Sequence, residues 1–281
     1  MIPRFHIDAW TEYAPWVTLG QTEQDLIISR ALVEIFSDPF LASELRFRGG
    51  TALNKLHFPE PLRYSEDIDL VRTSEGPIKD ILGTMQDILR PWLGDAAYKT
   101  SKVAPKLTYS VEAEDGTPIR LKIEINTRER TAFDGEIAFP YQVENPWFSG
   151  ACDIPTFSND EMLATKLRAL LQRDKGRDLF DLSHALTSLE QVDPANIVRL
   201  FEQYMEDAPL SRANAEQRMF QKLVNKDLLS DMRPLVRSDH IESFSDQALR
   251  DSFVLVFDKL ISQISGDPWA KTEAMRERFK I

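Results

Sequence analysis

The spacing of apolar residues changes near residue 155, and this change constrains the fold more than any other feature of the sequence. Before it, short apolar runs such as Ile68–Val71 stand between turn residues, a pattern typical of strands. After it, leucines such as Leu163 and Leu167 recur at helical spacing almost to the end of the chain. We therefore predict an α+β fold, with an α/β domain over residues 1–155 and a helical domain over residues 156–281.

Within the first domain, periodicity and turn residues predict individual elements. Helices are expected over residues 22–36, with Thr22 as the cap, and over 51–57 and 78–93. Strands are expected over residues 45–48, 68–71, 106–111 and 119–126. The last two should form a hairpin, because an Asp-Gly step lies between them. The segment 131–156 is rich in Pro, Gly and aromatic residues and is predicted to be irregular.

Composition excludes several classes of protein. No stretch approaches 18 consecutive apolar residues, so we expect no membrane span, and the N-terminus lacks the pattern of a secretory signal. The single cysteine, Cys152, excludes an internal disulfide and a thiolate zinc site, so we expect a cytoplasmic protein. The net charge of -11 excludes a uniformly basic nucleic-acid binder. One local basic cluster could contact RNA or nucleotide phosphates, or could be an ordinary strand rim. It consists of Arg120, Lys122, Arg128 and Arg130.

Two aspartates mark the start of a predicted strand. Asp67 and Asp69 are two positions apart, which in a strand places both side chains on one face, about 7 Å apart. Glu124 would lie on the outward face of its own strand and supplies a third carboxylate if the two strands are neighbours. Carboxylates so placed can hold Mg²⁺ or Mn²⁺ and align an attacking hydroxyl with a nucleoside triphosphate.

An Asp-x-Asp pair alone is weak evidence, because most such pairs are solvated strand ends. The preceding Gly49-Gly50-Thr51 strengthens the interpretation, since it falls where a predicted strand meets a predicted helix. Glycines allow the backbone to approach phosphates, and a helix N-terminus offers free N–H groups. A Gly-Gly pair by itself is usually only a turn.

Five strings occur in order along the chain: RGGTALNK (48–55), RYSEDIDL (63–70), LKIEIN (121–126), LATKLRAL (163–170) and RDLFDL (177–182). Together they resemble the AbiEii/AbiGii toxin family, which includes the MenT toxins and belongs to the DNA polymerase β-like nucleotidyltransferase superfamily. The resemblance implies a nucleotidyltransferase fold with a mixed sheet in the N-terminal domain, followed by a helical C-terminal domain.

The resemblance also implies roles for individual residues. Asp67, Asp69 and Glu124 would bind the metal, and Glu124 would deprotonate the acceptor hydroxyl. Lys166 would act in catalysis and reach the triphosphate from the helical domain. The remaining nucleotide-binding positions, with Asp178 and Asp181 as alternatives for the second half-site, are Gly49, Gly50, Thr51, Ser65, Asp178 and Asp181. In the MenT group the position of Ser65 is also linked to control by phosphorylation, and a phosphate there would repel an incoming triphosphate.

The function implied is that of a toxin of a toxin–antitoxin system, using Mg²⁺ or Mn²⁺ to transfer nucleotides from an NTP to RNA. The resemblance to MenT toxins favours the tRNA 3′ acceptor end, and the implied partners are an NTP, the RNA acceptor and a cognate antitoxin protein. Two alternatives remain open: transfer to a protein target, and a GTP- or NTP-binding regulator without catalysis.

Overall fold

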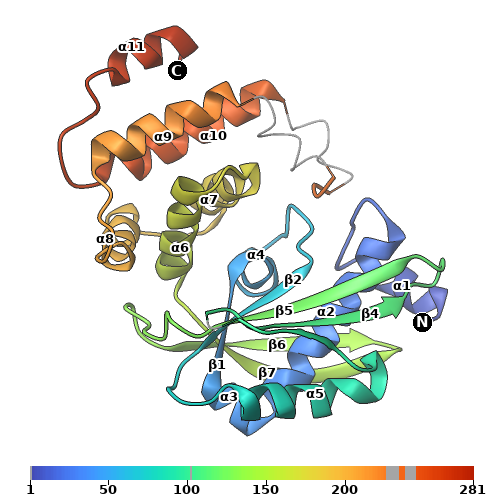
Figure 1. Cartoon of the computed structure of the whole chain (residues 1–281). Coiled ribbons are helices and arrows are strands. Elements are labelled where there is room, and N and C mark those ends of the chain that lie inside the picture. The colour runs from blue at the N-terminus through green and yellow to red at the C-terminus, as the bar shows by residue number, and fades with distance from the viewer. Residues whose placement is uncertain (1, 102, 226–233, 238–244) are drawn as a thin grey trace. The chain divides into compact units, whose positions relative to one another are not determined.

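A computed structural model describes residues 2–101, 103–225, 234–237 and 245–281 of the chain (Figure 1). The chain forms two compact units, Met1–Phe157 and Ser158–Ile281. The first unit combines helices with two sheets, and the elements described in the second are helices. The predicted α+β class with a mixed sheet is confirmed.

The first unit is organised by a five-stranded sheet of order β1-β2-β5-β4-β3. Its strands are β1 (Leu45–Arg48), β2 (Asp67–Arg72), β3 (Ala97–Lys99), β4 (Lys106–Glu112) and β5 (Pro118–Asn126). β2 and β5 run parallel, and the other neighbours are antiparallel. Ile68 and Leu70 of β2 and Ile123 and Ile125 of β5 are buried, and the residues between them are partly exposed. Alternation therefore places the acidic side chains of both strands on the opposite face.

The hairpin predicted between β4 and β5 is confirmed. The two strands pair from Lys106 opposite Glu124 to Glu112 opposite Pro118. In the connecting turn, the Asp115 carboxylate accepts hydrogen bonds from the backbone N–H and the hydroxyl of Thr117. These bonds hold the pKa of Asp115 below its usual range.

The prediction that residues 131–156 are irregular is wrong. The segment forms a second, two-stranded antiparallel sheet of β6 (Ile137–Asn145) and β7 (Phe148–Thr156). Pro140 and Pro155 made the segment look unlike a strand, because proline donates no ladder hydrogen bond. In a sheet of two strands, each strand has a free edge, so a proline whose missing N–H faces that edge costs no ladder bond.

Helices cover the sheets of the first unit. They are α1 (Arg4–Trp10), α2 (Leu19–Ser37), α3 (Pro39–Glu44), α4 (Gly49–Ala52), the π-helical turn η1 (Leu53–His57) and α5 (Lys79–Leu93). α2 packs against β5, β6 and β7, and α5 packs against α2 (Figure 1). Thr22 does not cap α2: Thr18 does, in a capping box with Gln21, and Thr22 instead donates to the carbonyl of Ala14.

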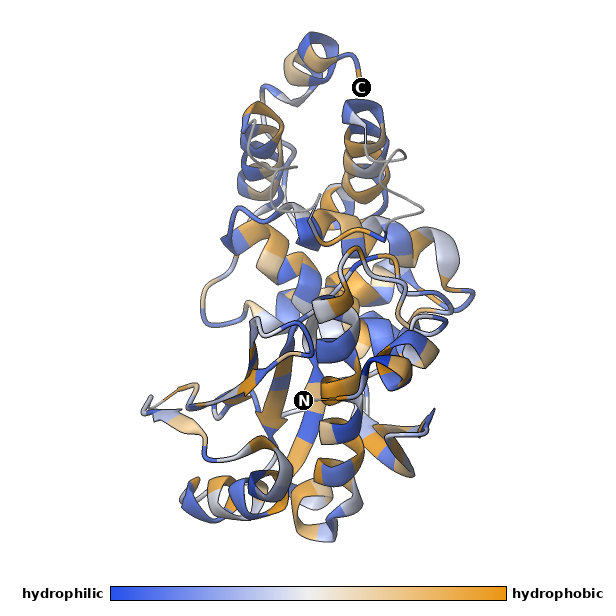
Figure 2. Ribbon diagram, turned by 90° about the vertical axis from the view of Figure 1, so that its right-hand side faces the viewer, coloured by the Kyte–Doolittle hydropathy of each residue, from blue (hydrophilic) through white to orange (hydrophobic). Residues whose placement is uncertain are grey.

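The second unit consists of helices with alternating apolar and polar residues (Figure 2). They are α6 (Asn159–Gln172), α7 (Gly176–Ser188), α8 (Pro194–Tyr204), α9 (Arg212–Val224), α10 (Asp246–Lys259), the short η3 (Ile261–Gln263) and α11 (Thr272–Phe279). Ser158 caps α6 by accepting a hydrogen bond from the N–H of Glu161. Across the described residues, no helix has the length and apolarity needed to span a membrane.

Candidate active site

The three predicted metal ligands share one face of the central sheet. In the parallel register of β2 and β5, Asp69 is the partner of Glu124, and Asp67 is the partner of Lys122. The strand pairing that Glu124 required is therefore present. The side chains of Asp67 and Glu124 are each slightly more than one quarter exposed, so solvent and small ions can reach both carboxylates.

Two lysines lie among these acids. The ammonium group of Lys122 is 2.5 Å from Asp67 Oδ2, and that of Lys106 is 2.6 Å from Glu124 Oε2. Burial lowers the pKa of Lys122, but its hydrogen bond to Asp67 and the surrounding carboxylates outweigh this effect and raise it. Lys122 therefore carries its full positive charge at neutral pH.

The environment of Asp69 disfavours its charged form. Burial raises its pKa, and the negative charges of Asp67 and Glu124 raise it further, against the opposing effect of Arg48 and Lys122. Arg48 is the register partner of Asp69 on β1, and its guanidinium is 2.5 Å from Glu129 Oε2. A raised carboxylate pKa between two other acids marks a place where added positive charge is stabilising.

The glycine pair lies directly against this acidic face. Gly49 has a φ of +87°, and a Cβ atom built on it would lie 2.6 Å from Asp69 Oδ2. A Cβ on Gly50 would collide with the guanidinium of Arg63 and lie 3.1 Å from Ser65 Oγ. Position 49 therefore favours glycine through its positive φ and its contact with Asp69, and a side chain at position 50 would displace Arg63.

Thr51 and Ser65 connect the glycine turn to β2. The hydroxyl of Thr51 donates to the backbone carbonyl of Asp67 at 2.5 Å and is 2.8 Å from Ser65 Oγ. Since Thr51 has one hydroxyl proton, Ser65 is the donor of the second hydrogen bond. The structure thus brings Gly49, Gly50, Thr51 and Ser65 together with the two aspartates, and Thr51 is buried in a structural role.

The donor set fits a hard divalent cation. Three carboxylates on neighbouring positions of one face supply the oxygen ligands that Mg²⁺ and Mn²⁺ prefer. Within the described part of the chain, no three His, Cys, Asp or Glu side chains are already arranged around one point as metal ligands. Two of the three carboxylates are instead turned toward lysines.

Lys166 and both candidate aspartates form a buried cluster in the second unit. The ammonium of Lys166 on α6 is 2.7 Å from Asp181 Oδ2 and 3.3 Å from Asp178 Oδ1, both on α7. Arg173 makes two hydrogen bonds to Asp178, at 2.6 and 2.8 Å. The structure brings the three predicted residues together, and a role in triphosphate binding stays a prediction for all of them.

Two site residues were missed or undervalued by the sequence. Lys106 was not singled out. Alternation along the strand places Lys122 on the face of Glu124, and Lys122 was also noted in a basic cluster, but its ion pair with Asp67 was not predicted. Lys106 depends on the register of β4 against β5, where it is the partner of Glu124. Spacing along the chain does not give that register.

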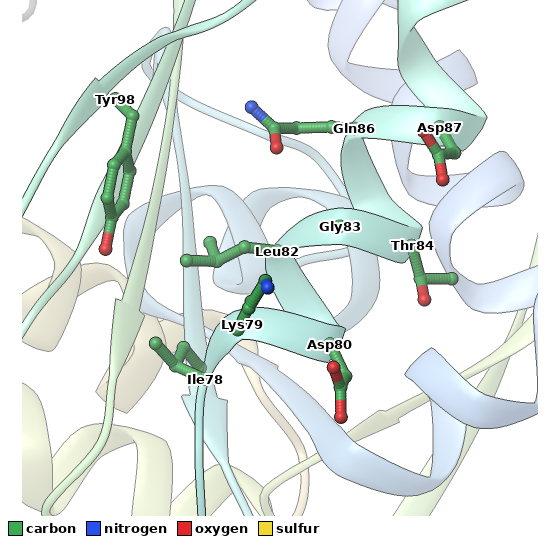
Figure 3. A pocket seen from close by; sticks show the side chains of 9 residues that line it. All are labelled: Ile78, Lys79, Asp80, Leu82, Gly83, Thr84, Gln86, Asp87 and Tyr98. Atoms are coloured by element: carbon green, nitrogen blue, oxygen red, sulfur yellow. The ribbon is translucent and has the colours of Figure 1, made fainter.

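An open cavity of about 510 Å³ lies elsewhere, between the first turns of α5 and the edge strand β3 (Figure 3). Tyr98 closes one side of it, and Ile78 and Leu82 form its apolar wall. Its polar side chains come from the exposed side of α5, and Lys79 is accompanied there by Asp80 and Asp87. None of the nine lining residues belongs to the predicted site.

Comparisons with known proteins bear on the family and the fold. The family model described as "Nucleotidyl transferase AbiEii toxin, Type IV TA system" matches residues 30–251. MenT4, a nucleotidyltransferase toxin from Mycobacterium tuberculosis, is similar in structure, with a TM-score of 0.63 and 15% identity over 100% of this chain and 97% of that chain. JHP933 from Helicobacter pylori has a TM-score of 0.49 and 17% identity over 94% of this chain and 98% of that chain. No curated protein sequence matches.

Proposed function

The chain belongs to the AbiEii family of nucleotidyltransferase toxins of type IV toxin–antitoxin systems, and from this membership we propose that it transfers nucleotides from an NTP to RNA. The acceptor proposed is the 3′ end of tRNA. The metal proposed is Mg²⁺ or Mn²⁺, held by Asp67, Asp69 and Glu124. The observation that carries the proposal is the placement of these three carboxylates on adjacent positions of β2 and β5.

Each part of the acidic face has a task in this reaction. A bound divalent cation would neutralise charge on the triphosphate as the bond to the leaving group breaks. Asp67 and Asp69 would hold that cation from β2. Glu124, beside Asp69, would accept the proton of the attacking hydroxyl as its oxygen bonds to the α-phosphorus and pyrophosphate leaves. The paired strands fix the backbone positions of all three acids relative to one another.

The glycine turn is proposed to hold the triphosphate. Gly49 and Gly50 are proposed to offer the backbone N–H groups of this turn to phosphate oxygens, with the side chain of Asp69 beside Gly49 and that of Arg63 beside Gly50. Ser65 lies next to this turn through its hydrogen bond with Thr51. Lys166 is proposed to add positive charge for the triphosphate, with Asp178 and Asp181 fixing its ammonium group.

Transfer is tested by incubating the pure protein with each labelled NTP, Mg²⁺ and total tRNA. Wild-type protein should label tRNA with at least one nucleotide. Asp69→Asn should lower the rate by about 100-fold or more, because a lost metal ligand removes several kcal/mol of transition-state stabilisation. Asp207→Asn, which removes the same charge from an exposed position, should behave like wild type.

Equal labelling by wild type and Asp69→Asn would refute the proposed site. Label on a protein instead of tRNA would refute the RNA acceptor and leave nucleotidyl transfer intact. The proposed partner, an antitoxin acting in the cytoplasm, is tested separately in cells. Expression of the chain should arrest growth, and co-expression of the neighbouring gene should relieve the arrest.

A further inference from the structure

Acidic and basic side chains lie in register with one another on the acidic face. The row through Asp69 runs from Arg48 on β1 to Glu124 on β5 and ends at Lys106 on β4. The row beside it pairs Asp67 with Lys122. The face thus has three acids and three bases, which are Asp67, Asp69, Glu124, Arg48, Lys106 and Lys122. Arg48 is itself paired with Glu129, and the two lysines make the ion pairs to Asp67 and Glu124.

The two lysines contact the same oxygen atoms that a metal ion would need. Lys122 is 2.5 Å from Asp67 Oδ2, and Lys106 is 2.6 Å from Glu124 Oε2. With two carboxylates held in this way, the three acids do not converge on one point, in agreement with the lack of a preformed metal cluster among the described residues. The lysines therefore determine the shape of the site as well as its charge.

We propose that Lys106 and Lys122 are resident counter-ions of the metal site, which a divalent cation displaces when it binds. This inference rests on the proposed metal-dependent function. Both lysine side chains are about one third exposed, so their ion pairs are screened by water and weak. A divalent cation can therefore replace them, and the site loses affinity in proportion to the pairs it must break.

The displaced lysines remain close enough to the site to contact a phosphate group. Each is fixed by its backbone on the strand that carries or adjoins Glu124, so its flexible stem leaves the ammonium group on the same face. There it offers positive charge to an anionic phosphate. Metal alone should then bind weakly, and metal with nucleotide should bind more tightly, because the phosphates compensate the released lysines.

Mn²⁺ titration of the full-length protein, followed by electron paramagnetic resonance without nucleotide, measures this competition directly. Lys106→Met and Lys122→Met should each lower the Kd for Mn²⁺ by about threefold or more, consistent with removal of a weak competing ion pair. Lys106→Arg, which keeps the charge, should bind Mn²⁺ like wild type. Lys259→Met removes a positive charge from an exposed position at the end of α10 and should also match wild type.

Asp69→Asn separates the inference from the function on which it rests. If Asp69→Asn abolishes Mn²⁺ binding while both Met variants bind Mn²⁺ no more tightly than wild type, the counter-ion role is wrong and the metal site stands. If Asp69→Asn binds Mn²⁺ like wild type, the metal site is wrong and the inference falls with it. Circular dichroism of each variant confirms that the fold is retained, so a change in Kd reports on the site.

Discussion

The absence of a side chain at Gly49 allows the backbone to lie close to the carboxylate of Asp69. Gly49 combines a left-handed φ of +87° with the carboxylate of Asp69, which lies 2.6 Å from the position that a Cβ atom would take. Gly135 has nearly the same φ, +86°, but a Cβ built there meets no atom within 4 Å. Substitution of Gly135 therefore measures backbone strain alone, and substitution of Gly49 measures backbone strain together with a clash against Asp69.

Gly49→Ala should lower both the stability of the protein and its rate of nucleotide transfer. Gly49→Ala and Gly135→Ala should each lower the free energy of unfolding by about 1–2 kcal/mol, because L-residues are strained at positive φ. Gly49→Ala should lose about 1–3 kcal/mol more by overpacking, and it should lower nucleotide transfer at least about tenfold by moving the Asp69 carboxylate. Thermal unfolding and labelled-NTP transfer of the two variants provide the comparison. Equal transfer by both would show that the approach of Gly49 to Asp69 has no bearing on the reaction.

At the scale of elements, the β6–β7 hairpin is fixed against α2 by a crowded contact. A Cβ on Gly150 of β7 would lie 3.0 Å from Val33 Cγ1 and 3.1 Å from a ring carbon of Phe148. Nearby, the guanidinium of Arg30 lies over the rings of Trp92 and Trp147, at 4.2 and 4.8 Å from their centroids. The aromatic residues of this hairpin therefore join α2 and α5 to the second sheet.

Gly150→Ala should therefore destabilise the protein by about 1–3 kcal/mol, because either Val33 or the hairpin must move. Gly83→Ala, inside α5, should instead stabilise it by about 0.5–1 kcal/mol, since a Cβ there meets nothing within 4 Å and alanine favours a helix. Urea unfolding measures both changes. Equal effects of the same sign would contradict this account of the hairpin contact.

The same elements show what the sequence could and could not predict. The strand of Asp67 and Asp69, the strand of Glu124 and the faces of their side chains follow from alternation and are confirmed. The hairpin of residues 137–156 was missed, because its prolines and Gly150 oppose strand propensity, and packing against α2, β1 and α1 compensates them. The ion pairs of Lys106 and Lys122 depend on three-strand register, which no local pattern specifies.

At the scale of the whole molecule, charge makes the chain sensitive to acid. The sequence has 45 acidic and 34 basic residues, and one of its buried acids is Asp178. Burial raises the pKa of Asp178, but Lys166 and then Arg173 lower it by more, so its pKa lies below the usual value. A carboxylate with a lowered folded-state pKa contributes stability above its unfolded pKa of about 3.9 and loses it as the pH falls through the folded value.

Asp178→Asn should therefore lower the free energy of unfolding by about 3–5 kcal/mol at pH 7, because it leaves Arg173 and Lys166 with less compensation. The difference from wild type should narrow below about pH 4, where wild type also loses this charge. Urea unfolding at a series of pH values tests this, with the exposed Asp207→Asn as the charge-matched control. A difference that stays constant from pH 7 to pH 2 would contradict the electrostatic role.

The parallel pairing of β2 with β5 also sets an order of events during synthesis. Asp67 and Lys122 are 55 positions apart, so the glycine turn and both aspartates leave the ribosome well before the strand that completes their face. Such distant pairing forms late, because the entropy cost of closing a long loop comes before the stabilising contacts between the strands. A growing chain therefore carries two of the three acids without a site, and the capacity for chemistry arises only once the central sheet has assembled.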